Sequence, residues 1–101
     1  MLECPERGRG DYDMYFISLI KFKKKPTKAF IAETQKLIDE NTKEGFKFHS
    51  MYWTLGKYDA VAVYEAPDEK SAMKAAIMRA DLMSIETLVG IPREEIKKLV
   101  E

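Results

Sequence analysis

The sequence predicts an α+β domain, a ferredoxin-like βαββαβ sandwich in which a four-stranded antiparallel sheet carries helices on one face. Runs rich in β-branched and aromatic residues alternate with amphipathic stretches in the order strand, helix, strand, strand, helix, strand. The first and third strand-like runs are the most uniformly apolar, as expected for the two central strands of such a sheet. With 101 residues, the chain has room for one domain built around one core.

The strands are predicted from their composition and alternation. The run 14–22 reads MYFISLIKF and has almost no polar residue, which indicates a central strand buried on both faces. The run 46–55 alternates along its length, so it is predicted to place His49, Met51 and Trp53 on one face of the sheet. The other two predicted strands are 60–66 and 83–91.

The helices are predicted from apolar residues at helical spacing and from their end signals. The first is expected over 27–44, with Thr27 as its N-cap and Gly45 at its end. The second begins after Asp68, its predicted N-cap, and a short third helix starts at Pro92. The core-facing residues expected on the second helix are Ala72, Met73, Ala76, Ile77 and Ala80.

The domain proper is predicted to cover residues 14–101, because residues 1–13 show neither strand nor helix periodicity and are interpreted as an N-terminal tail. Seventeen Lys and Arg residues balance seventeen Asp and Glu residues, so no basic bias favours nucleic acid. No run reaches the roughly 18 apolar residues of a membrane span. The single cysteine, Cys4, can form neither an intrachain disulfide nor a cysteine-rich metal site, which favours a cytoplasmic location.

Oligomerisation is expected from the distribution of apolar residues. Two helices can cover one face of the sheet only, whereas the central strands are apolar on both faces. An uncovered apolar face of that size is rare in monomers. The simplest cover is a second copy of the chain packed sheet on sheet, which predicts a homodimer or a higher homo-oligomer.

A turn separates the second and third predicted strands and has two interpretations. In the first, Gly56 supplies a positive φ, Asp59 accepts backbone hydrogen bonds and Tyr58 folds back over the strands. In the second, Tyr58 and Asp59 lie at the mouth of a cavity and bind a ligand.

The stretch LGKYDAVAVYEAPD, which contains this turn, resembles the GYD-domain family, named for a Gly-x-Tyr-Asp-like turn between the second and third strands. The resemblance runs from Met14 to about Val89 and includes SIETL in the fourth strand. It implies a small protein related to the dimeric α+β barrels, a group that includes cofactor-independent monooxygenases, muconolactone isomerases and stress-response barrels. It implies a fold and a dimer, with no cofactor and no particular substrate.

Candidate site residues are few. His49, the only histidine, could abstract a proton from an activated substrate or could be an ordinary strand residue. One histidine and one tail cysteine offer no metal-ligand spacing, so no metal is expected. Tyr52, Trp53 and Tyr64 could line a pocket for an apolar ligand or belong to the core. The candidate ligand-binding residues are His49, Tyr52, Trp53, Tyr58, Asp59 and Tyr64.

Three functions are consistent with these features. The favoured one is an oligomeric small-molecule-binding or regulatory domain, similar to the effector domains of leucine-responsive regulators but without room for their DNA-binding helices in residues 1–13. The alternative is a cofactor-independent oxygenase or isomerase that uses His49, or Tyr52 and Tyr64, inside the barrel. The third is a structural module whose cavity is filled by its own side chains. Residue spacing reveals no pair of a catalytic acid and a catalytic base, so the sequence leaves open whether the protein is an enzyme.

Overall fold

A computed structural model describes residues 14–100, and the predicted tail 1–13 lies outside these residues. The secondary structure follows the predicted order, and each predicted boundary lies within a few residues of the observed one. The elements are β1 (Met14–Phe22), α2 (Lys28–Lys43), β2 (Lys47–Trp53), β3 (Ala60–Ala66), α3 (Glu69–Met78), β4 (Met83–Gly90) and α4 (Arg93–Val100).

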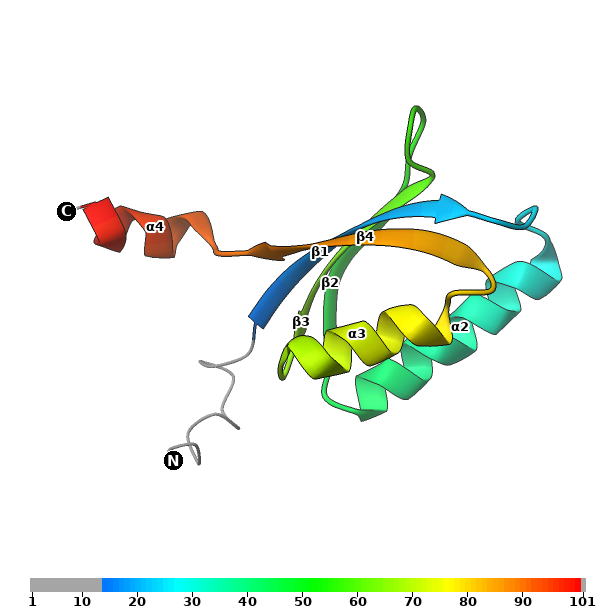
Figure 1. The fold of residues 1–101 in the computed structure, drawn as a ribbon, viewed down its shortest axis with the longest axis horizontal. Helices are drawn as coiled ribbons and strands as arrows, with labels where there is room; N and C mark the ends of the chain where they lie inside the picture. Colours follow the sequence, from blue (N-terminus) through cyan, green and yellow to red (C-terminus); the bar gives the residue numbers. More distant parts are fainter. Residues whose placement is uncertain (1–13, 101) are drawn as a thin grey trace.

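The four strands form one antiparallel sheet in the order β2-β3-β1-β4, which confirms β1 and β3 as the central strands. Helices α2 and α3 lie on the same side of this sheet (Figure 1). The predicted ferredoxin-like arrangement is therefore confirmed. Because both long helices occupy one face, no helix of residues 14–100 covers the other face of the sheet.

The predicted helix ends are confirmed by their hydrogen bonds. The Thr27 side chain accepts a hydrogen bond of 3.2 Å from the backbone nitrogen of Phe30 and caps α2. Asp68 caps α3 by accepting a bond of 2.8 Å from the backbone nitrogen of Ser71. Gly45, with φ of +102°, follows the end of α2 in the left-handed region that favours glycine.

The main core lies between the sheet and α3. Tyr64 of β3 stacks on Phe16 of β1 and on Phe46, with ring centroids 5.7 Å and 5.6 Å apart. Ala72 and Ala75 of α3 complete this cluster, and their small side chains bring the helix close to the sheet. A second cluster lies near the beginning of α2 and consists of Phe30, Leu82 and Met83.

The predicted buried stripe of α3 is wrong for its two largest residues, Met73 and Ile77, and for Ala80, which is exposed and lies beyond the end of the helix. Met73 and Ile77 are 65% and 68% exposed, whereas Ala72, Ala75 and Arg79 are buried. The helix has alanines on several sides, so its sequence is compatible with more than one inward-facing stripe. The packed stripe is the one that presents the smallest side chains to Tyr64 and its neighbours.

The predicted facing of β2 is correct only for its first half. A β-bulge lies between Phe48 and Ser50, so that His49 is an extra residue in the ladder with β3. Phe48 and, after the bulge, Met51 and Trp53 pair with β3 residues of the helix-covered face. His49 therefore does not share a face with Met51 and Trp53, because an inserted residue reverses the alternation of every residue after it.

Helix α4 extends away from the rest of the domain at the C-terminal end of β4 (Figure 1). Its predicted apolar patch is present but uncovered in the single chain. Ile96, Leu99 and Val100 are 39%, 71% and 79% exposed.

Gly56 has φ of +107°, which confirms its predicted place in the hairpin turn, and its substitution tests this turn. Gly56→Val is expected to destabilise the fold by about 1–3 kcal/mol, because a β-branched residue is strained in this conformation. The loss would be purely conformational, since a Cβ atom at this position meets nothing within 4 Å.

The matched control is Leu55→Val, which places the same side chain on the neighbouring, fully exposed residue of negative φ. Thermal denaturation should separate Gly56→Val from this control. Coincident melting curves for the two variants would contradict the strained turn.

Candidate functional site

A cavity of about 120 Å³ lies between the helix-covered face of the sheet and the two helices α2 and α3. All four strands contribute to its lining, which is mainly apolar and aromatic. Met51 and Trp53, on the edge strand β2, are 45% and 59% exposed, so the cavity opens along this edge. An apolar hollow with a few polar groups is the usual form of a small-molecule site. Aromatic lining residues are Phe22, Phe30, Phe46, Phe48, Trp53 and Tyr64.

A row of hydroxyl groups crosses the sheet floor of the cavity. The Ser18 hydroxyl of β1 lies 3.2 Å from the Tyr64 hydroxyl of β3 and 3.3 Å from the Thr87 hydroxyl of β4. Ser18 and Tyr64 are both buried. Each hydroxyl has one donor and two acceptor positions, so the row keeps capacity for a ligand after its internal bonds are made.

Arg79 places a buried positive charge beside this cavity. It caps the C-terminal end of α3, is 9% exposed, and donates one hydrogen bond of 2.9 Å to the backbone oxygen of Ala75. Burial lowers the pKa of the guanidinium, and this shift is opposed by Tyr64 and Glu40. An arginine stays protonated in proteins. Within residues 14–100, ion pairs link His49 with Glu65 and Lys74 with Glu44, and no carboxylate pairs with Arg79.

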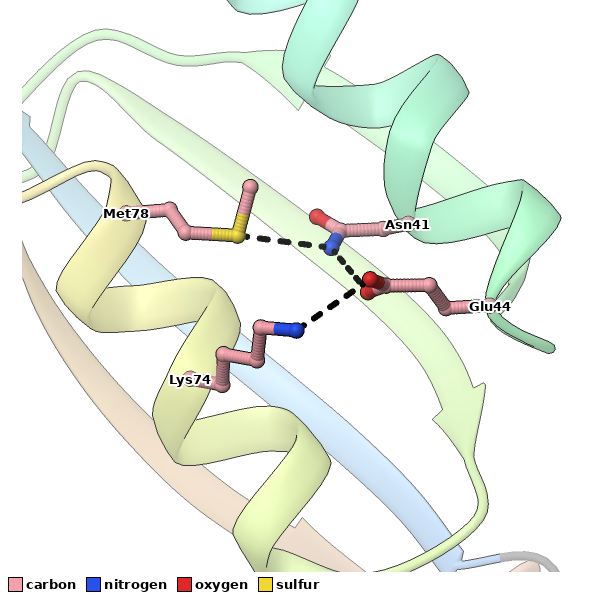
Figure 2. A network of polar contacts seen from close by, with 4 residues as sticks. All are labelled: Asn41, Glu44, Lys74 and Met78. Atoms are coloured by element: carbon pink, nitrogen blue, oxygen red, sulfur yellow. Dashed lines mark hydrogen bonds and ion pairs between the residues drawn. The ribbon is translucent and has the colours of Figure 1, made fainter.

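Asn41 brings a second buried polar group to the cavity, from the last turn of α2. Its amide nitrogen lies 3.4 Å from Oε1 of Glu44 and 4.0 Å from the Met78 sulfur. Oε2 of the same Glu44 pairs with Lys74 of α3 at 3.3 Å, and Figure 2 shows this network joining the two helices. The Asn41 side chain is fully buried, and its oxygen Oδ1 has no hydrogen-bond partner within the described part of the chain.

The structure brings the side chains of two predicted candidate residues, Tyr64 and Trp53, to this cavity. Tyr64 is buried in its floor, and Trp53 packs edge-on against Phe22 at a centroid distance of 5.1 Å. Tyr52 borders the cavity, but it pairs with Val61 of the helix-free face, so its side chain points away from the cavity and is 64% exposed.

Tyr58 and Asp59 do not line the cavity and instead hold the hairpin. Oδ2 of Asp59 accepts a hydrogen bond of 2.8 Å from the backbone nitrogen of Phe22, and its own nitrogen donates to the Ile20 oxygen at 2.7 Å. These bonds tie the turn to β1. The Tyr58 hydroxyl donates to Glu86 of β4 at 2.8 Å, and this hydrogen bond raises the pKa of Tyr58.

His49 lies on the face of the sheet without helices, away from the cavity. Its Nε2 atom is 2.6 Å from Oε2 of Glu65, a buried carboxylate, and its ring stacks on Tyr15 with centroids 5.8 Å apart. The negative charge of Glu65 raises the pKa of the Tyr15 hydroxyl. The bulge in β2 thus separates His49 from Tyr64 and Trp53.

Sequence patterns alone did not select Asn41, Arg79, Ser18 or Thr87, although a signal for two of them exists. Asn41 lies three residues after Ile38, and Arg79 lies four residues after Ala75, so each continues a buried helical stripe.

Among the described residues, no group of three or more His, Cys, Asp and Glu side chains could hold a metal ion. No helix in residues 14–100 has the length and hydropathy to cross a membrane. The cytoplasmic location stays a prediction.

Residues 16–100 match the family model of the GYD domain. The chain belongs to the GYD domain family. This match covers all seven observed secondary-structure elements except the first two residues of β1. No curated protein sequence matches the chain.

Solved structures show the same fold at low sequence identity. The GYD domain protein is similar to the crystal structure of MtbAldR, with a TM-score of 0.54 and 8% identity over 79% of this chain and 54% of that chain. It thus spans about half of MtbAldR. Protein YJCS is similar with a TM-score of 0.53 and 18% identity, over 78% of this chain and 98% of that chain. The chain and these two structures thus share an α+β fold.

Proposed function

We propose that this GYD domain protein is a homodimeric small-molecule-binding domain whose ligand lies between the sheet and helices α2 and α3. The observation that carries this proposal is the cavity of about 120 Å³, which combines aromatic walls with buried polar groups. This combination gives a ligand both apolar contact and a fixed orientation.

The size of the cavity favours a ligand over a purely structural role. Because the cavity opens along β2, water can enter it, and a ligand with an apolar surface would be favoured by displacing that water. A structural module would be expected to fill the space with its own side chains. A cavity of about 150 Å³ is known to accept benzene, so a ligand with one ring suits this volume.

The uncovered sheet face supports the dimer. Its apolar side chains from the central strands are only half-buried in the single chain, and Leu88 of β4 is 42% exposed. A second sheet packed on this face would remove them from water. The central-strand residues concerned are Tyr15, Ile17, Leu19, Val61 and Val63.

The alternative function, a cofactor-independent oxygenase or isomerase, has less support. It was predicted to use either His49 or the pair Tyr52 and Tyr64. His49 lies on the helix-free face, and Tyr52 pairs with Val61 of that same face, so of these groups only Tyr64 has its side chain in the cavity. Chemistry in the cavity would have to use Tyr64 without His49.

A thermal-shift screen of ring-sized small molecules tests the proposal, because a ligand that binds only the native state raises the melting temperature. The best ligand is then tested on Ala75→Leu, which fills the cavity from α3, and on His49→Ala and Tyr58→Phe, which lie outside it. We expect Ala75→Leu to abolish the shift and the other two variants to keep it.

Each variant is compared with its own ligand-free melt, because overpacking by Ala75→Leu costs stability of about 1–3 kcal/mol. A shift that survives in Ala75→Leu would place the site elsewhere. A broad screen without any ligand would contradict the binding function itself.

A further inference from the structure

We infer that the ligand is a small organic acid, with an apolar body of about one ring and a carboxylate that pairs with Arg79. This inference rests on the proposed binding function and specifies the class of ligand. It is carried by two buried polar groups that meet at one cavity, one positively charged and one an acceptor without a partner.

The first argument is the charge of Arg79. Its side chain lines the cavity and is 9% exposed, yet among residues 14–100 it donates one hydrogen bond, to the Ala75 oxygen at 2.9 Å, and forms no ion pair. A buried charge is costly unless an opposite charge and hydrogen bonds compensate it. The planar fork of a guanidinium matches a carboxylate, which can accept two parallel hydrogen bonds.

The second argument is the orientation of Asn41. Its nitrogen must face Glu44, because the reverse orientation would set the amide oxygen against a carboxylate oxygen. Figure 2 shows the nitrogen in contact with Glu44 and Met78 and the oxygen directed away from Glu44. Oδ1 is thus left as a fully buried acceptor. Oδ1 has no accessible surface in the ligand-free chain, so a hydroxyl or amino group on the ligand would satisfy it once the Asn41 side chain turns toward the cavity.

The third argument is the apolar remainder of the lining. Phe30, Phe46 and Phe48 surround a space that suits one ring. A neutral ligand would leave Arg79 without a carboxylate in contact, since Glu40 forms no ion pair with it, and an amine would add a second positive charge beside it. A ligand that pairs with Arg79, donates to Oδ1 of Asn41 and fills the apolar part of the cavity is a hydroxy or amino carboxylic acid with about one ring.

Calorimetric titration with three probes of equal size tests this class: 3-hydroxybenzoate, 3-hydroxybenzyl alcohol and 3-hydroxybenzylamine. We expect the acid to bind the wild-type protein about tenfold or more tighter than the alcohol, as a charge-assisted hydrogen bond predicts. We expect the amine to bind weakest of the three.

Arg79→Met should reduce acid binding to the level of the alcohol and leave alcohol binding unchanged. Its ligand-free melting temperature should equal or exceed that of the wild type, because a buried charge that has no ion pair among the described residues is removed. Arg79→Lys keeps the charge without the planar fork and should keep part of the preference. Lys70→Met removes an exposed charge from the same helix and should change no affinity.

Equal binding of acid and alcohol, or an acid affinity unchanged in both Arg79→Met and Arg79→Lys, would overturn the acid class. The binding function would survive that result if Ala75→Leu still abolished binding of the probe. Failure of all three probes to bind the wild type would also overturn this inference, whereas the broad screen decides separately on the binding function.

Discussion

Phe16→Asp is expected to abolish folding. Phe16 is 2% exposed in the central strand β1 and stacks on Tyr64 in the main core. A carboxylate at this position would be buried without a partner, which costs about 4 kcal/mol or more and approaches the whole stability of a typical small domain. Far-ultraviolet circular dichroism and thermal denaturation measure the result.

Phe16→Leu is the matched control, because it keeps an apolar side chain in the same place. It should fold and melt cooperatively at a lower temperature than the wild type, since the smaller side chain leaves a cavity. A cooperative melt of Phe16→Asp close to that of the wild type would show that β1 is not packed as described.

Ile17→Asp is expected to leave the protomer folded and to dissociate the dimer. Ile17 is the next residue in β1, so its side chain points to the opposite, helix-free face, where it is half-buried in the single chain. The new carboxylate can stay hydrated in a monomer but not between two apolar sheets. Sedimentation velocity at micromolar concentration should give the monomer mass, with circular dichroism close to the wild type.

The control for this face is Ile17→Val, which should remain a dimer. A dimer of unchanged strength in Ile17→Asp would place the interface elsewhere, and a monomeric wild type would contradict the proposed assembly. The two aspartate variants differ by one position in sequence, so their different outcomes would together verify which way the strand faces.

The strand and helix order was predictable because it rests on local patterns. Alternation, helical spacing, the caps Thr27 and Asp68 and the glycines Gly45 and Gly56 each act within a few residues of the chain. The position of the central strands followed from their uniformly apolar composition. These features can be predicted without knowing which helix or strand packs against which.

The bulge at His49 was not predictable from alternation. The segment around it, FKFHSMYW, carries large side chains at successive positions, so either register leaves an acceptable apolar face. The choice is made by pairing with β3, where the inserted residue brings Met51 and Trp53 to the helix-covered face. The predicted grouping of His49 with Trp53 failed for this reason.

The candidate site was predictable only in its aromatic part. Tyr64 and Trp53 belong to residue types that line pockets, and both do line the cavity. Asn41 and Arg79 were missed because polar residues on helices are normally exposed, and only the tertiary packing shows these two to be buried.

The most direct test of a ligand between sheet and helices uses Trp53, the only tryptophan in the chain and a lining residue of the cavity. Tryptophan fluorescence is followed while 3-hydroxybenzoate is titrated into the wild type and into Ala75→Leu. We predict a saturable change in the wild type that is absent in Ala75→Leu. An identical saturable change in both proteins, or a calorimetric binding signal without any change at Trp53, would contradict a ligand in this cavity.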